Sequence, residues 1–366
     1  MSYCELHCCS AFSFLRGGSF PEQLAEVAAE LEMPAIALLD RNGVYGAQRF
    51  SVAAREHGVR PIIGAELSME DGSILPVLVE NRTGYKNLCE LLTQAHLRSE
   101  KGQCTVRWDE LPQFAQGLIA FLGSARLQRA NASPARTFGI LPKRTSTNSQ
   151  SPKSSRMQDA FATKLQACAP QNASDRTRFL IDVFGPKNVF VEIQRHFIRG
   201  EQQINRNLID LAHANRLPLL ATNGVQYAKP YGREVLDVFT CIREHIHLDA
   251  AGKLLSQNAE RHLKNDREMR AIFADLPEAI ENTSRLAERL TFSLENLGYE
   301  FPEYPVPAGH TMDSFLRTIV WFGAQQRYAA ISAKVNRQLE EELALIAKLG
   351  FPGYFLIVWD IVNFCR

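Results

Sequence analysis

The feature that most constrains the fold of this chain is a regular alternation of short apolar runs with helix-like segments. Apolar runs of this length are typical of buried strands. After a first strand-like run near residue 5, they occupy residues 35–39, 61–63, 75–79, 118–122, 189–193 and 217–221. Strands separated by helical segments favour a parallel sheet with helical crossovers. The pattern therefore predicts an α/β protein built on parallel strands.

The segment after the first strand predicts an amphipathic helix. Ser19 followed three residues later by Glu22 is the sequence signature of a capping box. The apolar positions that follow fall on one helical face, and they are Leu24, Val27, Ala28 and Leu31. The other face carries acidic residues, so we expect it to face solvent.

Length and composition favour a soluble globular protein of two domains. The chain has 366 residues, 45% of them hydrophobic and 22% charged, and its formal net charge of +1 does not indicate a globally basic nucleic-acid binder. Its eight cysteines form no CxxC pair and no cleavable signal sequence is recognisable, which favours a cytoplasmic protein with free thiols. An apolar run near the end is interrupted by Asp360 and is shorter than the roughly 18 residues of a membrane span.

Polar side chains follow most of the predicted strands at the point where each strand ends. In βα architectures these carboxyl ends meet at one mouth, where functional groups gather. The groups at these ends are His7, Cys9, Asp40, Arg41, Glu66, Glu192, His196 and Asn223 to Gln226. Any one of them alone is commonly a structural residue, but together they predict a pocket.

The motifs that carry these residues resemble a known family. In chain order they are ELHCCSAFSFLRGGS, LLDRNGVYGAQRF, IIGAEL, ENRTGYKNLCELL, VEIQRH and ATNGVQY. This series resembles the PHP (polymerase and histidinol phosphatase) domain that opens bacterial C-family DNA polymerases. It is most similar to the error-prone class, which is related to the DNA polymerase III alpha subunit. The resemblance covers nearly the whole chain apart from about residues 127–172.

The resemblance implies a fold and a division into domains. Residues 1–235 are expected to form a PHP-type distorted (β/α)7 barrel, and residues 236–366 a mainly helical segment that leads into a polymerase palm. Within the barrel, residues 127–172 are rich in Ser, Thr, Pro and basic residues, which predicts a disordered insertion. Its seven positive charges could contact phosphates nonspecifically, or the insertion could be a solvated loop without a dedicated role.

The resemblance also implies a metal site, because intact PHP domains bind up to three metal ions and hydrolyse phosphoesters. His7 and Glu66 match the ligand pattern of the family, and Cys9 stands where a second His belongs. These three residues are the weak candidates for residual Zn²⁺ or Mn²⁺ binding. We expect neither metal, and no catalytic residue, in this chain.

The remaining ligand positions of the pattern hold residues that cannot bind a cation. Arg16 stands in place of an acid and Arg41 in place of a His, while Gly224 and Gln226 replace an Asp and a His. An arginine stays protonated and offers no lone pair to a metal. We therefore interpret the site as degenerate.

The two arginines suggest that fixed cations replace exchangeable ones. Unpaired buried carboxylates cost several kcal/mol each, so Asp40, Glu66 and Glu192 need positive partners. Arg16 and Arg41 could neutralise them through bidentate hydrogen bonds and form a structural clasp. The alternative is that both arginines point to solvent. His196 has structural and site roles open to it, whereas His245 and His247 fit a loop better than a metal site.

The polymerase chemistry of the family is expected to lie outside this chain. In the family, a Gly-rich stretch and three acidic residues that hold catalytic Mg²⁺ follow the segments that resemble residues 258–294 and 342–366. The acids after Tyr304 are scattered, with residues 340–342 on a helix face, so they do not form the cluster that two-metal chemistry needs. The aromatic residues of this end predict an exposed apolar face for the missing palm, and they are Trp321, Phe322, Phe351, Tyr354, Phe355 and Trp359.

Three functions follow as hypotheses. The first is a noncatalytic scaffold, the amino-terminal part of an error-prone DNA polymerase in damage-tolerant replication and repair. Its expected partners are DNA, the palm and thumb of the polymerase, and other translesion or replisome proteins, with no membrane. The second is a metal-dependent phosphoesterase or exonuclease of the PHP superfamily. The third is a binding module that acts without a polymerase partner.

Overall fold

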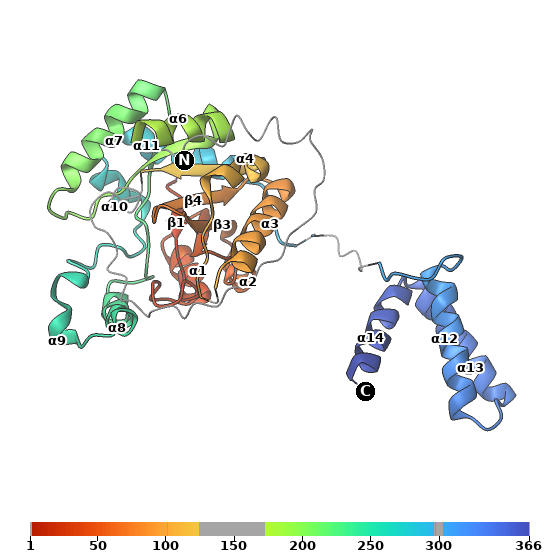
Figure 1. Ribbon diagram of the computed structural model, residues 1–366. Helices are drawn as coiled ribbons and strands as arrows, with labels where there is room; N and C mark the ends of the chain where they lie inside the picture. The colour runs from red at the N-terminus through yellow and green to blue at the C-terminus, as the bar shows by residue number, and fades with distance from the viewer. Residues whose placement is uncertain (1, 101, 124–172, 296, 298–302, 366) are drawn as a thin grey trace, which may run out of the picture. The chain divides into compact units, whose positions relative to one another are not determined.

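The computed structural model describes residues 2–100, 102–123, 173–295, 297 and 303–365, and it divides into two compact units (Figure 1). The units are Met1–Glu295 and Asn296–Arg366. The division expected between residues 235 and 236 falls inside the first unit, because the helix Pro277–Arg289 packs on the first and last strands of its sheet. The insertion predicted at residues 127–172 lies outside the described residues.

The first unit is built on one sheet whose strands lie in chain order. They are β1 (Glu5–Cys8), β2 (Ala35–Arg41), β3 (Arg60–Ser68), β4 (Ile74–Val79), β5 (Leu118–Leu122), β6 (Val189–Ile193) and β7 (Leu219–Ala221). Each predicted apolar run falls on one of these strands. The predicted α/β fold class is therefore confirmed.

One strand runs against the predicted direction. β4 is antiparallel to both β3 and β5, whereas the other neighbouring strand pairs are parallel. Only residues 69–73 connect β3 to β4, and a parallel crossover needs about a dozen residues or more. The prediction of an all-parallel sheet is wrong at this strand because its connection is too short.

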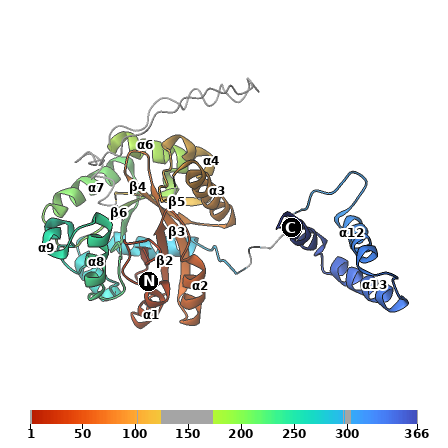
Figure 2. The same ribbon diagram turned by 60° about the horizontal axis from the view of Figure 1, so that its bottom comes forward.

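Helices surround the sheet in the first unit, as Figure 2 shows for α1, α2, α3, α6 and α7. The helices are α1 (Pro21–Glu30), α2 (Ala47–Glu56), α3 (Arg82–Arg98), α4 (Leu111–Phe114), α6 (Ala173–Phe184), α7 (Glu201–Asn215), α8 (Gly232–Glu244), α9 (Leu248–Ala251), α10 (Asp266–Ile272) and α11 (Pro277–Arg289). Short 3₁₀ turns are η1 (Trp108–Glu110), η3 (Pro186–Asn188) and η4 (Gly252–Leu254).

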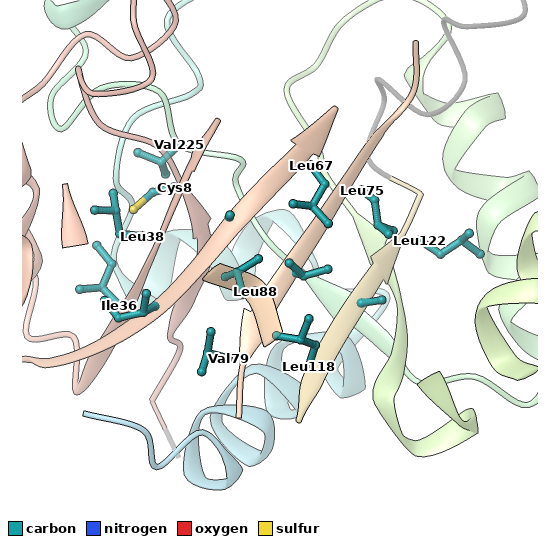
Figure 3. Close-up of a cluster of buried hydrophobic side chains, with 14 of the residues drawn as sticks. Cys8, Ile36, Leu38, Leu67, Leu75, Val79, Leu88, Leu118, Leu122 and Val225 are labelled. Atoms are coloured by element: carbon teal, nitrogen blue, oxygen red, sulfur yellow. The ribbon is translucent and has the colours of Figure 1, made fainter. Parts of the chain in front are cut away.

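Buried strand side chains form two apolar clusters, one on each face of the sheet, because successive side chains of a strand alternate between faces. The outer cluster packs helices against the sheet, and its strand residues include Cys8, Ile36, Leu38, Leu67, Leu75, Val79, Leu118 and Leu122 (Figure 3). The inner cluster combines strand residues with one helix, and it contains Cys4, Leu6, Ala35, Ala37, Leu39, Ile62, Leu78, Ile119, Phe121, Phe190, Leu220 and the α11 residues Leu286, Ala287 and Leu290.

Helix α11 closes the inner cluster at the amino ends of the parallel strands. Arg60, the first residue of β3, donates hydrogen bonds to the carbonyls of Leu290 and Ala287, each at 2.7 Å. Asn282 of α11 donates to the carbonyl of Leu219 at 2.9 Å. The carboxyl ends of the strands therefore lie at the opposite end of the sheet, where the predicted site residues are.

The first strand carries an irregularity that matters for the site. Its register against β2 shifts between Glu5 and Cys8. Leu6 belongs to the inner cluster and Cys8 to the outer one, although regular alternation would put them on the same face. Beyond β7, Val225 pairs with Cys8 in a parallel bridge, which curls the last strand exit back to the first and fits the predicted distorted barrel.

The amino-terminal cap of α1 differs from the predicted capping box. The residue before the helix is Phe20, and its N–H donates to the Gln23 side chain at 2.9 Å. Ser19 Oγ instead accepts a hydrogen bond from the N–H of Ala228 at 2.9 Å, and Glu22 takes part in an ion pair. The capping-box prediction is wrong because a tertiary contact uses the Ser19 hydroxyl.

The second unit consists of α12 (Met312–Arg327), α13 (Ala333–Lys348) and α14 (Pro352–Cys365). Its small core centres on Leu316, Leu343 and Leu356. The predicted exposure is found at Phe322, Tyr354, Phe355 and Trp359, whereas Trp321 and Phe351 are half-buried. Among the described residues, no single helix has the length and apolarity to cross a membrane; α13 and α14 meet that criterion only as a pair bent by 115°.

Candidate functional site

The carboxyl end of the sheet holds a buried cluster of opposite charges centred on His7. Its Nδ1 lies 2.5 Å from Glu192 Oε1, and its Nε2 lies 3.0 Å from Glu66 Oε1. The three residues come from β1, β6 and β3, and all are buried. The imidazole therefore bridges two carboxylates from strands that are far apart in the sequence.

This geometry fixes the charge state of His7. Burial by itself lowers the pKa of an imidazole, but the carboxylates of Glu192 and Glu66 raise the pKa of His7 to about 10. The pKa of Glu192 is lowered although burial opposes this, because the His7 cation lies beside it. At neutral pH His7 is thus an imidazolium that donates from both ring nitrogens.

Arg41 holds the second oxygen of Glu66. Its Nε donates to Glu66 Oε2 at 2.8 Å, and its Nη2 lies 2.7 Å from the same oxygen without good hydrogen-bond alignment. Two guanidinium nitrogens thus meet one oxygen, and the pair is not the bidentate arrangement that we expected. Only 11% of the Arg41 side chain is exposed, so the alternative that Arg41 points to solvent is wrong.

Glu192 is the most enclosed carboxylate of the cluster. Its Oε1 accepts from Thr222 Oγ1 at 2.5 Å and from Gln194 Nε2 at 3.0 Å, in addition to His7. Its Oε2 has no hydrogen-bond partner within the described ranges of the chain. One oxygen in such a position can accept a water, but a cation needs several ligands.

Asp40 lies on the other face of the sheet from this cluster. Alternation along β2 puts Asp40 with the outer cluster and Arg41 with the inner one. The Asp40 carboxylate accepts hydrogen bonds from the N–H and Oγ of Ser10 and from Ser13 Oγ, at 2.8–3.0 Å. Burial raises the pKa of Asp40. Hydroxyl and backbone groups therefore donate hydrogen bonds to Asp40, whereas we expected an arginine as its partner.

Cys9 and Arg16 occupy the loop between β1 and α1. The N–H of Cys9 donates to the carbonyl of Val225 at 3.0 Å, and its Sγ lies 3.9 Å from the carbonyl oxygen of Arg16. Arg16 is half-buried, and its N–H donates to the carbonyl of Ser13 at 2.8 Å. The predicted pairing of Arg16 with a carboxylate stays a prediction.

The exit of β7 is filled by a cation from a later segment. Gly224 has a φ of 54°, and its carbonyl accepts from Arg261 Nη1 at 3.1 Å. The backbone of Gln226 accepts from Gly18 N–H at 2.7 Å and donates to the Arg261 carbonyl at 2.9 Å. A Cβ on Gly224 would lie 2.5 Å from Gln194 Nε2. Gly224 and Gln226, which replace an Asp and a His of the family pattern, are therefore held in place by contacts with neighbouring segments.

His196 belongs to a separate hydrogen-bonded group beside the cluster. Its Nε2 donates to the carbonyl of Asn223 at 2.8 Å, and its Nδ1 lies 3.2 Å from Glu201 Oε1. Burial, together with the positive charge of Arg261, lowers the pKa of His196. This favours a neutral imidazole with a structural role.

Several residues of the site were not singled out from the sequence. Tyr3 O–H donates to Glu5 Oε2 at 2.7 Å, and the N–H of Asn223 donates to the same oxygen at 2.9 Å. Burial raises the pKa of Glu5 to about 7. Glu5 precedes His7 by two residues, and a buried acid inside an apolar strand was the available signal. Arg261 had none, because its partners Gln194 and Gly224 lie far away in the sequence. Gln194 stands in the VEIQRH motif, where its type alone does not indicate the bond to Glu192.

The described residues do not assemble a metal centre. In the part of the chain that the structure covers, no three His, Cys, Asp or Glu side chains are grouped so that they could hold an ion. His245, which follows α8, and His247 lie on the surface.

Two family models match the chain. One is described as "PHP domain" and matches residues 5–196, which is more than half of the chain. The other is described as "Bacterial DNA polymerase III alpha NTPase domain" and matches residues 314–366. The matched ranges fall in the first and in the second structural unit.

Two relatives that match the whole chain are named error-prone DNA polymerase. The one from Mycobacterium bovis is 35% identical over 379 residues, which cover 100% of this chain and 32% of the relative. The one from Caulobacter vibrioides is 33% identical, covering 100% and 30%. The chain thus spans about a third of the length of these relatives. A solved amidohydrolase from Chromobacterium violaceum, with bound sulfate and no metal, is 11% identical, with a TM-score of 0.36 over 62% of this chain and 88% of that one.

Proposed function

This chain belongs to the PHP domain family, and from that premise we propose that it acts as the amino-terminal part of an error-prone DNA polymerase, with its PHP fold as a scaffold. The names of the relatives and the polymerase III alpha match at residues 314–366 support the polymerase half of the proposal. DNA is the substrate that such a protein implies. Its setting would be damage-tolerant replication and repair in the cytoplasm, beside other translesion or replisome proteins.

The observation that carries the scaffold half is the position of Arg41 against Glu66, at the place of a ligand in the family pattern. A metal ligand must offer a lone pair, and a guanidinium has none. Arg41 also occupies one oxygen of Glu66, and His7 lies at the other. The residues present therefore do not fit the multinuclear metal centre of the superfamily.

Two permanent features support the same proposal. Arg41 brings a fixed positive charge to the place where metal ions need negative charge. Gly224 has no side chain to act as a ligand, and Gln194 fills the space beside it. We infer that cationic side chains hold the strand exits together, as metal ions would in an intact relative.

The catalytic Mg²⁺ of the polymerase family would be bound by downstream parts of the protein. The exposed aromatic side chains of α12 and α14, such as Phe322, Tyr354 and Trp359, support a proposal that the palm packs on them. Residues 1–366 alone are then expected not to extend a primer.

Elemental analysis of the purified chain tests the scaffold proposal. After incubation with Mn²⁺ or Zn²⁺ and dialysis, we expect substoichiometric metal, because protonated His7 and Arg41 occupy the site. Arg41→His is a matched variant that removes the fixed charge, and it should neither bind metal stoichiometrically nor gain hydrolysis, since His7 remains paired. Two or more metals per wild-type chain would contradict the proposal.

A hydrolysis assay separates the scaffold from the second candidate function. A phosphoesterase or exonuclease would cleave a chromogenic phosphodiester or a single-stranded oligonucleotide in the presence of Mn²⁺. We expect no turnover above the level of a His7→Gln variant. Turnover that disappears in this variant would establish the hydrolase instead.

A further inference from the structure

A basic pocket lies at the amino ends of β6 and β7, at the far end of the sheet from His7. Its volume is about 680 Å³, within the ~300–1,000 Å³ of ligand sites. Three segments line it: the turn before β6, the end of α7 before β7, and one face of α11. The lining residues that the argument uses are Lys187, Asn188, Arg216, Asn282, Arg285 and Arg289.

The charge of this pocket is one-sided. Four of its lining residues are cationic, and no Asp or Glu lines it. Arg285 pairs with Glu281 at 3.0 Å and Arg289 with Glu80 at 2.9 Å, so two of the four charges are neutralised. The other two, Lys187 and Arg216, are exposed, and no side-chain hydrogen bond or ion pair engages them within the described residues. The pocket thus keeps two unused positive charges.

Part of the pocket is held rigidly. Arg289 donates to the Lys187 carbonyl at 2.8 Å and to Asn188 Oδ1 at 2.7 Å, which ties α11 to the turn before β6. Asn282 is anchored to the Leu219 carbonyl. A ligand would therefore meet a preformed wall, and only Lys187 and Arg216 would have to become ordered.

The backbone at Arg216 adds an independent observation. Arg216 ends α7 with a φ of 55°, in the left-handed region. Glycine is the residue that adopts this conformation without a steric penalty and is the usual one at such a helix end. An arginine here is accommodated at a cost in stability, and it adds a free guanidinium to the pocket wall.

We propose that this pocket binds backbone phosphates of DNA. Guanidinium and ammonium groups are the side chains that hold phosphate oxygens, and an exposed cluster of them contacts the backbone without reading its sequence. The choice of DNA as the source of the phosphates rests on the proposed polymerase function. The pocket would steady the scaffold on the nucleic acid outside the polymerase site.

Fluorescence anisotropy with a labelled DNA duplex and the full chain tests the proposal. The pocket variant carries Lys187→Ala and Arg216→Ala. Its matched control carries Lys253→Ala and Arg199→Ala, which remove the same charges from exposed positions after α9 and after β6. Both pairs leave the buried structure untouched, and equal unfolding midpoints in urea would verify this.

The pocket variant should bind the duplex roughly tenfold more weakly at low salt. The slope of its log affinity against log salt concentration should fall by the equivalent of about one to two phosphate contacts. The control should change affinity less than about twofold. Equal losses in the two variants, or no loss in the pocket variant, would overturn the proposal. So would pocket-dependent binding of inorganic tripolyphosphate by a chain that does not bind the duplex.

The scaffold function proposed above would be refuted by different measurements from those that test the phosphate site. Stoichiometric metal or Mn²⁺-dependent hydrolysis would refute the scaffold, and neither measurement involves Lys187 or Arg216. A chain without metal whose pocket variant binds DNA normally would leave the scaffold proposal intact and remove only the phosphate site.

Discussion

The two ends of the sheet use positive charge in opposite ways. At the carboxyl end, His7 is buried and only 11% of the Arg41 side chain is exposed. Both point at carboxylates, with Glu66 between them. At the amino end, Lys187 and Arg216 face solvent and contact no acid in the described chain. Burial therefore decides the role of a cation: enclosed charges hold strands together, and exposed ones remain available to a partner.

This contrast predicts a large difference in stability effects. A buried pair that loses one partner leaves an uncompensated charge, which is far costlier than the loss of an exposed charge.

The largest effect is expected for His7→Gln. The substitution removes the cation between Glu66 and Glu192 and leaves two neighbouring carboxylates in a buried site. We expect the free energy of unfolding at pH 7 to fall by about 3–5 kcal/mol, measured by urea denaturation. Lys187→Gln, its counterpart at the exposed end, should change it by less than about 0.5 kcal/mol. A loss below about 1 kcal/mol at His7 would show that the two ends do not differ.

The next effect is the pH dependence of the difference in stability between the wild type and His7→Gln. The folded pKa of His7 is raised to about 10, from an ordinary value near 6.5. A raised pKa contributes stability that is complete below about pH 6.5 and is lost as the pH rises through about 10. The advantage of the wild type over His7→Gln should therefore shrink by up to about 1.4 kcal/mol per pH unit between pH 7 and 9.

The comparison of the two proteins removes the contribution of other groups. Cysteine, tyrosine and lysine side chains titrate in both, so their effects cancel in the difference. Glu5 and Glu192 are exceptions, because the His7 cation lowers the pKa values of both carboxyls, which therefore titrate higher in the variant. A wild-type free energy of unfolding that stays constant from pH 7 to 9 would mean that His7 is not an imidazolium.

Much of the fold was predictable because local patterns encode it. Apolar runs bounded by polar residues marked the positions of all seven strands found in the described residues. The antiparallel direction of β4 was missed, although the short connection at residues 69–73 was readable and excludes a crossover. The capping box at Ser19 failed for another reason: its hydroxyl binds Ala228, whose position only the folded chain determines.

The candidate site was predictable in its residue types but not in its pairing. The motifs singled out His7, Glu66, Arg41 and Glu192, and the structure brings them together. Alternation along β2 already puts Asp40 and Arg41 on opposite faces, but the sequence does not tell which of the two faces holds His7. The irregularity in β1 also leaves no local signature, although it changes the face on which Cys8 lies.

A smaller effect is expected for Gly224→Asp, which restores the acid of the family pattern. Gly224 has a φ of 54°, and a Cβ would lie 2.5 Å from Gln194 Nε2. Gly58→Asp is the matched control, since its φ of 73° carries a similar backbone penalty with nothing within 4 Å. Gly224→Asp should cost about 1–2 kcal/mol more than the control in urea denaturation. Equal costs would show that Gln194 yields easily and that the ligand position can be rebuilt.

The smallest effect, and the one with opposite signs in two assays, is expected for Arg216→Gly. Glycine relieves the left-handed backbone at the end of α7, so the free energy of unfolding should rise by up to about 1 kcal/mol. Loss of the guanidinium should at the same time weaken binding of the DNA duplex. Asn215→Gly, one residue earlier in helical conformation, is the control, and it should lower stability without changing DNA affinity. If Arg216→Gly were more stable and bound DNA as well as the wild type, the exposed end would hold an ordinary solvated arginine, and the two ends of the sheet would differ only in burial.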